Sequence, residues 1–269
     1  KKHIKEIAIK DRTELDRWIL SELNSLIKIV DESYSDYEPT RAARAISDFV
    51  TEHLSNWYVR LSRRRFWKGE YTNDKIAAYQ TLYSCLETIS ILMSPIAPFF
   101  SDRLFRDLNT VSSLRKATSV HLADFPELNI AIIDKSLEER MELAQQISSM
   151  VLSLRKKVNI RVRQPLNKIL IPVLDEAFKI KVEAVKDLIL AEVNVKEIEY
   201  IHDTKGVLVK KIKANFKVLG KKVGGLMKDV AACIVAMTQE QIQTLEAEKK
   251  FEFEVLDQTI IITDEDVEI

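Results

Sequence analysis

The sequence predicts a mainly α-helical protein, with an antiparallel helical bundle followed by a smaller α+β domain. In the first half of the 269 residues, apolar side chains recur every three or four positions, as on the buried face of a helix. After Pro165 the pattern changes to short apolar runs and to alternation of apolar with charged residues, which is typical of strands. We therefore expect a helical domain in residues 1–128, a long connecting helix in 129–160, and an α+β domain in 161–269 that is truncated at its end.

Four helices joined by short connections are expected in the first domain, and such connections favour an antiparallel bundle. Thr13 suits the N-cap of the first helix, because its side chain can accept a hydrogen bond from an otherwise unpaired N–H. Pro39 suits the first turn of the second helix, which should run on through an arginine cluster to Gly69. Asn73 or Asp74 is expected to cap the third helix, and two prolines separate it from a short fourth one.

The last domain should combine helices with an antiparallel or mixed sheet. The expected helices begin after the cap residue Asp175 and again in residues 226–237 and 239–248. The expected strands cover residues 166–173, 193–201, 207–218, 251–256 and 259–263. Because helices and strands are interspersed in this part of the chain, its class is α+β.

The composition indicates a soluble, cytoplasmic protein. Apolar residues make up 46% and charged residues 30% of the chain, and no apolar run reaches the roughly 18–20 residues that span a bilayer. Cys85 and Cys233 lie in apolar helical patterns, so we expect two buried thiols in a reducing compartment, and neither a disulfide nor a metal site. The chain has no initiator methionine and no signal peptide, and we expect it to be a piece of a larger protein.

Charge is unevenly distributed along the chain, although the formal net charge is zero. Basic residues gather in three runs, whereas the end of the chain after Glu240 is acidic. The basic runs consist of Arg60, Arg63, Arg64, Arg65 and Lys68; of Arg155, Lys156, Lys157, Arg161, Arg163 and Lys168; and of Lys205, Lys210, Lys211, Lys213, Lys217, Lys221 and Lys222. Segregated charge of this kind can present basic surfaces while the whole chain stays neutral.

The sequence contains no recognisable catalytic or metal-binding constellation. The four histidines are scattered, and none stands at metal-ligand spacing with a cysteine. His53 falls near the apolar face of the second helix, where we expect a packed or hydrogen-bonded structural residue. The glycines around Gly224 lack the spacing of phosphate-binding loops. We therefore expect no catalytic residue, no metal site and no cofactor in this chain.

The strongest local feature is the end of the second helix, where Arg60, Arg63 and Arg64 lie outside the apolar stripe. Guanidinium groups pair with phosphates in bidentate fashion or stack on unpaired bases, and RNA loops offer both. The residues alone leave two interpretations open. The arginines contact nucleic acid, or they form a solvated basic face and pair with nearby acids such as Glu52 and Glu70.

Several motifs resemble the anticodon-binding domain of class I tRNA synthetases. Some are shared by the enzymes for isoleucine and valine, namely LDRWILS at 15–21, YEPTRAARAI at 37–46 and MSPIAPF at 93–99. Others resemble the isoleucyl branch that includes eukaryotic and some bacterial enzymes, namely NWYVR at 56–60, RRRFW at 63–67, RVRQPL at 161–166 and KANFKVLG at 213–220. In the last of these, Ala214 stands where the family pattern has a proline.

The resemblance implies that the chain is the C-terminal, anticodon-binding portion of an isoleucyl-tRNA synthetase, a ligase that attaches isoleucine to its tRNA with ATP and magnesium. The adenylate-forming motifs and the editing domain of that family are absent from these residues, and the family's zinc sites need cysteine clusters that the chain lacks. The implied role is recognition of the anticodon stem and loop of isoleucine tRNA. We expect a monomer that works with the catalytic and editing domains of the same chain.

Resemblance and charge together predict which residues contact RNA. The first candidates are Arg60, Arg63, Arg64 and Lys68, followed by Arg41, Arg44, Arg161, Arg163, Lys213 and Lys217. Trp67 is expected either to stack on a base or to lie in the core, and Arg65 is expected either to contact RNA or to hold the helix to its neighbours. We expect Trp57, Tyr58 and Leu61 to be core residues.

Two alternatives to this function stay open. A helical adaptor module could use the same arginines to bind an acidic protein. The domain could also belong to a valyl or leucyl enzyme, although the RRRFW segment at 63–67 argues against that reading.

Overall fold

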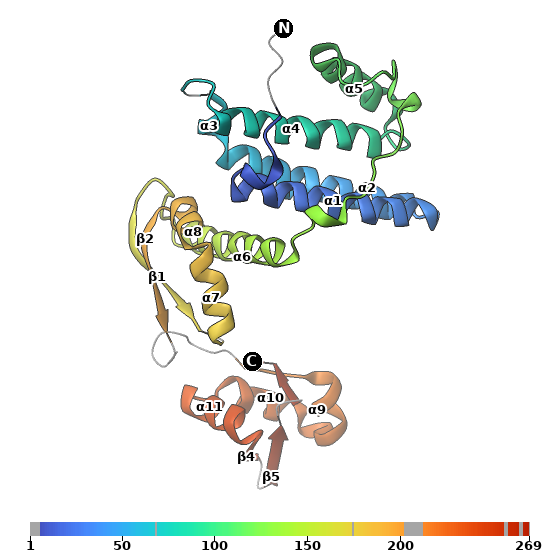
Figure 1. Ribbon diagram of the computed structural model, residues 1–269. Coiled ribbons are helices and arrows are strands. Elements are labelled where there is room, and N and C mark those ends of the chain that lie inside the picture. Colours follow the sequence, from blue (N-terminus) through green and yellow to red (C-terminus); the bar gives the residue numbers. More distant parts are fainter. Residues whose placement is uncertain are drawn as a thin grey trace. The chain divides into compact units, whose positions relative to one another are not determined.

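The computed structural model describes residues 6–67, 69–173, 175–201, 212–255, 258–263 and 266–268, and it divides into two compact units (Figure 1). The first unit consists of Lys1–Ile169 and Asp175–Ile198, and the second of Leu170–Leu174 and Glu199–Ile269. The expected class, a helical bundle followed by an α+β region, is confirmed. The boundaries expected near residues 128 and 160 stay a prediction about separately folding domains.

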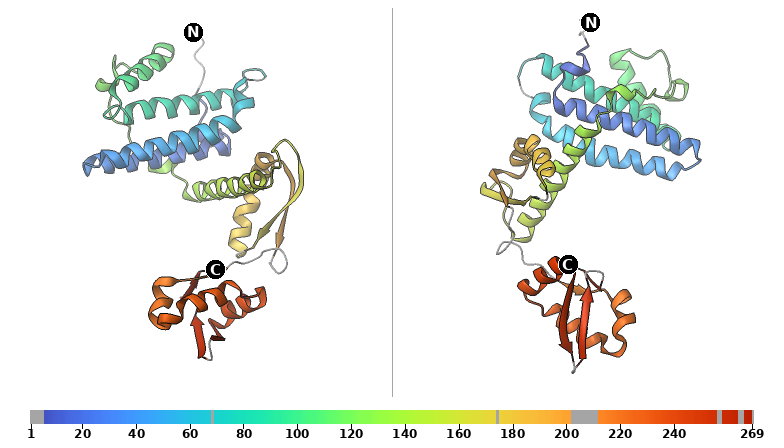
Figure 2. Two further views of the ribbon diagram at one scale, coloured as in Figure 1. Left: turned by 180° about the vertical axis from the view of Figure 1, so that it is seen from behind. Right: turned by 60° about the horizontal axis from the view of Figure 1, so that its bottom comes forward.

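Packed helices build the first unit, and Figure 2 shows α1, α2 and α4 lying side by side. Helix α1 covers Glu14–Ser35, α2 covers Pro39–Asp48 and α4 covers Asn73–Leu92. A further helix of the bundle, α5, covers Pro98–Ser112. Short 3₁₀ turns occur at Ile9–Asp11, Val120–Leu122 and Ile130–Ile132. The core between the helices contains Trp18, Tyr58, Ala78 and Leu92, all without exposed surface.

The predicted helix ends are partly right. Thr13 accepts a hydrogen bond from the Asp16 N–H and caps α1, and Pro39 occupies the first turn of α2, both as expected. The cap of α4 is Thr72 instead of Asn73 or Asp74, because the extended backbone of Thr72 lets its hydroxyl accept from the Lys75 N–H. Asn73 and Asp74 are therefore the first residues inside the helix.

The second predicted helix is not one regular element. After α2 the chain widens into a π-helical stretch, Phe49–Val59, and a turn at Ser62 separates it from the short helix α3, Arg63–Trp67. Phe49, Leu54, Trp57 and Tyr58 are the buried residues of the π-helical stretch, whose turn is wider than that of an α-helix because its hydrogen bonds join residues five positions apart. Three- and four-residue spacing could not distinguish this stretch from an α-helix.

After the bundle the chain continues through a helix and a strand–helix–helix–strand segment, and the ends of its two strands, from Leu170 and from Glu199, are counted with the second unit. Its elements are α6 (Lys135–Lys157), β1 (Leu166–Pro172), α7 (Glu176–Ala184), α8 (Lys186–Val193) and β2 (Val195–Ile201). The Leu166 N–H donates to the Asn194 carbonyl and the Val173 N–H to the Ile201 carbonyl. In these two hydrogen bonds the residue number increases in the same direction along both strands, so β1 and β2 run parallel. Helices α7 and α8 form the crossover connection between them.

The second unit has its own small core. Its elements are β3 (Lys213–Ala214), α9 (Phe216–Val223), a 3₁₀ turn (Gly224–Leu226), α10 (Met227–Val235), α11 (Gln239–Glu248), β4 (Lys250–Val255), β5 (Gln258–Thr263) and β6 (Val267–Glu268). Strand β4 pairs with β5 and β3 with β6, both antiparallel. Apolar residues of both strand pairs and the helices, including Leu219, Ile234, Leu245 and Ile262, form the core.

Three predictions about the second half need correction. The described strands form three two-stranded sheets instead of one. Residues 216–218, expected at the end of a strand, begin helix α9, and residues 207–211 lie outside the described part of the chain. Cys85 is buried as expected, but Cys233 is exposed, because the apolar face of α10 turns Val230 and Ile234 inward instead. Among the described helices, none is long and apolar enough to cross a membrane.

Candidate nucleic-acid interface

Helix α3 is held to the bundle by one of its own arginines. The guanidinium group of Arg65 donates two hydrogen bonds to the Asp16 carboxylate, of 2.6 and 3.0 Å, and further bonds of 2.8 and 3.0 Å to Asp74. The Tyr58 hydroxyl donates to Asp16 as well, at 2.6 Å. Arg65 is therefore the bridge between helices that the sequence left as one of two possibilities.

The Asp16 carboxylate at the centre of this network has no exposed surface. Burial by itself would raise its pKa, but the hydrogen bonds from Arg65, Tyr58 and Thr13 outweigh this effect and lower the pKa below its ordinary value. The same network raises the pKa of the Tyr58 hydroxyl, through burial first and the Asp16 charge second. Asp16 is thus ionised at neutral pH and fixes the orientation of α3.

With Arg65 and Phe66 turned inward, the other side chains of α3, those of Arg63, Arg64 and Trp67, face solvent. Trp67 is 77% exposed, which excludes the core position, one of the two alternatives that the sequence left open, and leaves its ring accessible for stacking. The guanidinium carbon of Arg63 lies 5.4 Å from the centre of the Trp67 ring, a cation–π contact. Arg64 is exposed and has no ion pair with any described residue. Lys68 lies outside the described residues.

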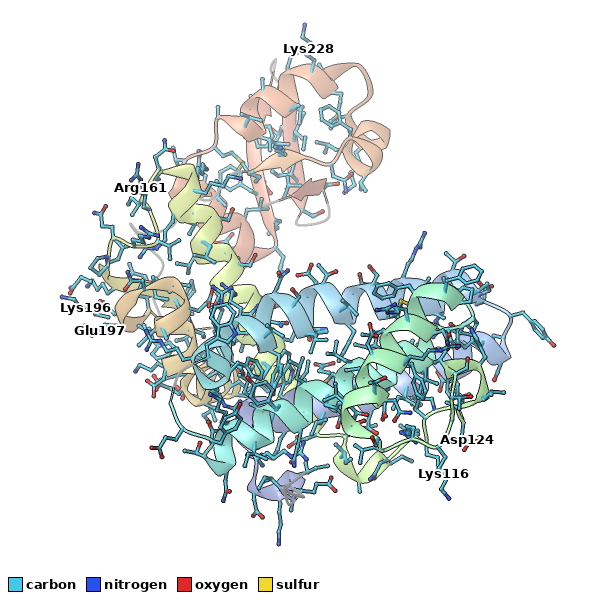
Figure 3. All side chains as sticks on the ribbon, turned by 90° about the horizontal axis from the view of Figure 1, so that it is seen from above. Lys116, Asp124, Arg161, Lys196, Glu197 and Lys228 are labelled. Atoms are coloured by element: carbon cyan, nitrogen blue, oxygen red, sulfur yellow. The ribbon has the colours of Figure 1, made fainter. Side chains whose placement is uncertain are left out.

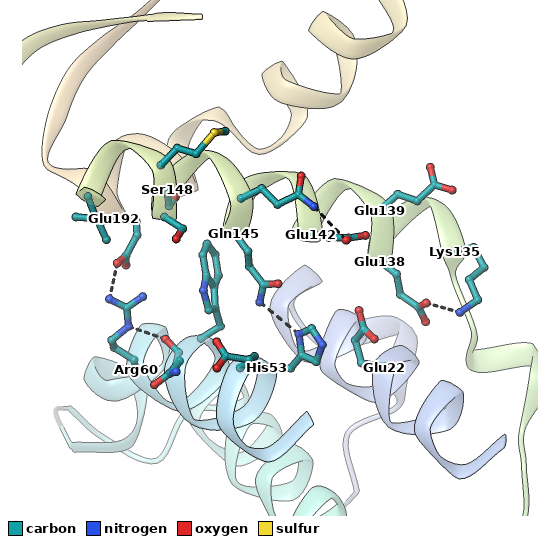
Figure 4. A pocket seen from close by; sticks show the side chains of 17 residues that line it. Glu22, His53, Arg60, Lys135, Glu138, Glu139, Glu142, Gln145, Ser148 and Glu192 are labelled. Carbon is teal, nitrogen blue, oxygen red and sulfur yellow. Dashed lines mark hydrogen bonds and ion pairs between the residues drawn. The ribbon is translucent and has the colours of Figure 1, made fainter. Parts of the chain in front are cut away.

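Arg60 is placed differently from Arg63 and Arg64. Its guanidinium group forms an ion pair with Glu192 of α8, and its Nε donates to the Asn56 carbonyl at 2.6 Å (Figure 4). Its side chain remains 46% exposed. The sequence suggested pairing with neighbouring acids, but the partner is 132 residues away, so no local pattern could have identified it.

The end of α8 also positions the loop that carries Arg161 and Arg163. Arg155, which is 2% exposed, donates to the carbonyls of Asn194, Gln164 and Arg161. The Asn194 side chain donates in turn to the Val162 carbonyl at 2.8 Å. Arg155 is thus a structural residue inside the second basic run, and Figure 3 shows Arg161 projecting outward from the loop.

Two sets of arginines that were predicted to contact RNA are held by the end of α8: Arg60 by Glu192, and the loop of Arg161 and Arg163 by Asn194. Arg60 lies just before α3, and Arg161 and Arg163 are both exposed. Figures 1 and 2 show α3 and α8 on the same side of the unit. The structure therefore presents exposed basic residues from two distant segments on one side.

The remaining predicted contacts are less closely related to α3. Arg41 and Arg44 are exposed on α2. Lys213 is exposed on β3 of the second unit, and Lys217 lies on α9, where its side chain is outside the description. The predictions for these four residues stay predictions.

A groove beside Arg60 was not expected from the sequence. It has a volume of about 1250 Å³ and lies between the π-helical stretch and α6, with Glu22 of α1 and Glu192 of α8 at its edges (Figure 4). His53 lines it, with its ring 5.7 Å from that of Trp18 and its Nδ1 3.4 Å from Gln145. His53 is thus a packed residue, as predicted, and burial lowers the pKa of its imidazole.

A family model described as the anticodon-binding domain of tRNA ligase matches residues 16–170, more than half of the chain. The chain belongs to this family. Within the matched residues of the anticodon-binding domain lie the Asp16–Arg65 bridge, the exposed face of α3 and the loop of Arg161 and Arg163.

Curated relatives of this anticodon-binding domain are named isoleucine–tRNA ligases. One from Cytophaga hutchinsonii is 58% identical over 98% of this chain and 24% of the relative. One from Bacteroides fragilis is 56% identical over 98% of this chain and 23% of the relative. One from Treponema denticola is 39% identical over 90% of this chain and 22% of the relative. The chain therefore spans about a quarter of the length of these relatives.

The described part of the anticodon-binding domain shows no group of three or more histidine, cysteine, aspartate or glutamate side chains that could hold a metal ion. Its candidate chemistry is recognition through guanidinium groups and an exposed indole ring. Sequence reasoning missed three residues on which this geometry depends, namely Asp16, Glu192 and Asn194. Only Asp16 left a signal, an acid among the apolar residues of the first helix.

Proposed function

We propose that this chain is the part of an isoleucine–tRNA ligase that binds isoleucine tRNA at its anticodon stem and loop. One observation carries the proposal: Arg65 anchors α3 to buried Asp16, so that Arg63, Arg64 and Trp67 face solvent. The family match over residues 16–170 supports the tRNA loop as the ligand.

The three outward residues suit different parts of an RNA loop. Arg63 and Arg64 donate to phosphate oxygens, which supplies affinity and fixes the register of the RNA. Trp67, already covered on one face by Arg63, offers its other face to an unstacked base. Arg161 and Arg163 extend the same basic side along the stem, with Arg41, Arg44, Lys68, Lys213 and Lys217 as further candidates for phosphate contact.

The activity of the whole protein is part of the proposal. The relatives named isoleucine–tRNA ligases support isoleucine over valine or leucine as the amino acid. The full-length enzyme would activate isoleucine with ATP and magnesium and transfer it to the tRNA, and it would work in the cytoplasm. The present chain would contribute tRNA recognition, and other domains of the same protein would contribute catalysis and editing.

The test is tRNA binding by the double variant Arg63→Ala/Arg64→Ala. We expect its affinity for isoleucine tRNA to fall about ten-fold or more, because two phosphate contacts are lost. The slope of log affinity against log salt should fall by about 1.5, since each phosphate contact contributes about 0.7–0.9. Filter binding across a salt series measures both quantities.

The matched control is Arg103→Ala/Arg106→Ala, which removes two exposed arginines from α5. This variant should bind isoleucine tRNA as the wild type does. Equal binding by the α3 double variant and the wild type at every salt concentration would refute the assignment. A preference for an acidic protein competitor over isoleucine tRNA would favour the adaptor function instead.

A further inference from the structure

The groove between the π-helical stretch and α6 is unsuited to RNA, although Arg60 lies at its edge. Six carboxylates line it, from Glu22, Glu52, Glu138, Glu139, Glu142 and Glu192. Its lining cations are Arg60 and Lys135, and each is already paired with a groove carboxylate, Arg60 with Glu192 and Lys135 with Glu138. Phosphates would meet net repulsion here, whereas a cation would meet attraction.

Not all of these carboxylates are neutralised within the fold. Glu139 pairs with Lys181 at 2.8 Å, but Glu52 has no ion pair with any described residue, and Glu142 only accepts a hydrogen bond from Gln146. Among the described residues, Glu22 accepts a hydrogen bond only from the Trp18 indole, at 3.2 Å. Three carboxylates that have no ion pair within the described part of the chain thus face one groove, from α1, the π-helical stretch and α6.

A buried polar group points to a ligand independently of this charge. Ser148, in the wall of the groove on α6, is 1% exposed, and its hydroxyl has no hydrogen-bond partner among the described residues. Figure 4 shows Ser148 on the side of α6 that faces the groove. An unpaired buried hydroxyl is unfavourable, because it has lost its hydrogen bonds to water, so a partner supplied by a ligand would stabilise it.

Size and polarity indicate the form of the ligand. The lining residues of α6 run from Lys135 to Leu152, a rise of about 26 Å at about 1.5 Å per residue. An extended peptide of about eight residues covers this length at about 3.3 Å per residue. Trp57, Met150 and Leu152 provide apolar surface toward one end, which suits a peptide better than a compact amine.

We propose that this groove binds a polypeptide segment that carries lysine or arginine side chains. The cationic groups would pair with Glu22, Glu52 and Glu142, and a polar group of the segment would reach the Ser148 hydroxyl. Apart from Arg60 and its partner Glu192 at one edge, the groove shares no residue with the RNA assignment, so either proposal can fail without the other.

The ionisation of Glu22 supports the proposal. Burial and then the Glu138 charge raise the pKa of the Glu22 carboxyl to about 7. The groups facing it are Lys135, Glu138 and Glu142 on α6, with Glu52 and His53 on the π-helical stretch. A bound cation would favour the charged carboxylate, so binding should release a proton and tighten as the pH rises from about 6 to about 8.

The test uses the 269-residue chain and a blocked, fluorescent peptide of about eight residues in which lysine alternates with alanine. The double variant Glu52→Gln/Glu142→Gln removes two uncompensated charges and keeps side-chain size. We expect it to bind the peptide about ten-fold more weakly at low salt, since each partly exposed pair contributes up to about a factor of five. Fluorescence anisotropy measures the affinity, repeated at about pH 6 and pH 8.

The matched control, Glu38→Gln/Glu197→Gln, removes the same charge from exposed positions outside the groove and should leave peptide affinity unchanged. A peptide in which glutamate replaces lysine should not bind. Equal peptide affinity of the groove variant and the control would overturn the proposal, as would absence of binding to the wild type. Weaker isoleucine tRNA binding by the groove variant would also overturn it, because the groove would then serve RNA.

Discussion

Asp16 and Arg65 come from different helices, and their ion pair compensates the charge that each side chain brings into the bundle. Arg65→Gln would leave the Asp16 carboxylate, which has no exposed surface, without its cation. We expect the free energy of unfolding to fall by about 3 kcal/mol, because an uncompensated buried charge remains. Urea denaturation followed by tryptophan fluorescence measures this loss.

Arg64→Gln is the control for this variant, since Arg64 is exposed and adjacent in sequence. Its effect should stay within about 0.5 kcal/mol. Comparable stability of the two variants would show that the bridge does not hold α3.

Glu22 gives a prediction about pH at the same scale. Its folded-state pKa of about 7 lies above the ordinary value of 4.5 for a glutamate, so its contribution to stability is present below about pH 4.5 and is lost as the pH rises through 7. Between pH 5 and pH 8, the wild type should lose roughly 2 kcal/mol relative to Glu22→Gln, after allowance for solvent screening. Urea denaturation of both proteins across this range measures the difference, and parallel pH profiles would contradict the expectation.

At the scale of elements, local sequence patterns predicted most helices but not the contacts that orient them. Thr13 and Asp175 cap their helices by accepting a hydrogen bond from a backbone N–H three residues later in the chain. Such a cap can be recognised from local sequence, and both were predicted correctly. The choice of Thr72 over Asn73 depends on a backbone angle that residue type does not determine. The Arg60–Glu192 pair requires knowledge of which helices meet, so the sequence could show the charge of Arg60 but not its partner.

The C-terminal end of α8 gives the prediction at this scale. Asn194 adopts a left-handed backbone, with φ of 52°, and its side chain donates to the Val162 carbonyl. Asn194→Ala loses the hydrogen bond and strains the backbone, so it should cost about 2 kcal/mol, whereas Asn194→Gly loses the bond alone and should cost about 1 kcal/mol. Thermal denaturation measures both, and a larger loss for glycine than for alanine would show that backbone strain is unimportant.

At the scale of the whole molecule, a formal charge of zero conceals opposite local charges. The outward face of α3 is basic, whereas the groove along α6 is acidic, and both belong to the first unit. Net charge would have argued against RNA as a ligand, but the local arrangement decides which ligand each face can accept. Arg60, which lines the groove, is paired there with Glu192.

The two units give the last prediction, because each has a core of its own. Leu245, fully buried in the second unit, is a suitable probe: Leu245→Ala should destabilise that unit by about 2–5 kcal/mol. All three tryptophans, at positions 18, 57 and 67, belong to the first unit, so their fluorescence reports its unfolding alone. Circular dichroism reports both units.

We therefore expect Leu245→Ala to lower the urea midpoint of part of the circular dichroism signal and to leave the fluorescence midpoint unchanged. Leu26→Ala, at a buried position of α1, should do the reverse and lower the fluorescence midpoint. Separate transitions would follow from two cores that unfold independently. An equal shift of the fluorescence midpoint by Leu245→Ala would instead show that the units unfold as one cooperative structure.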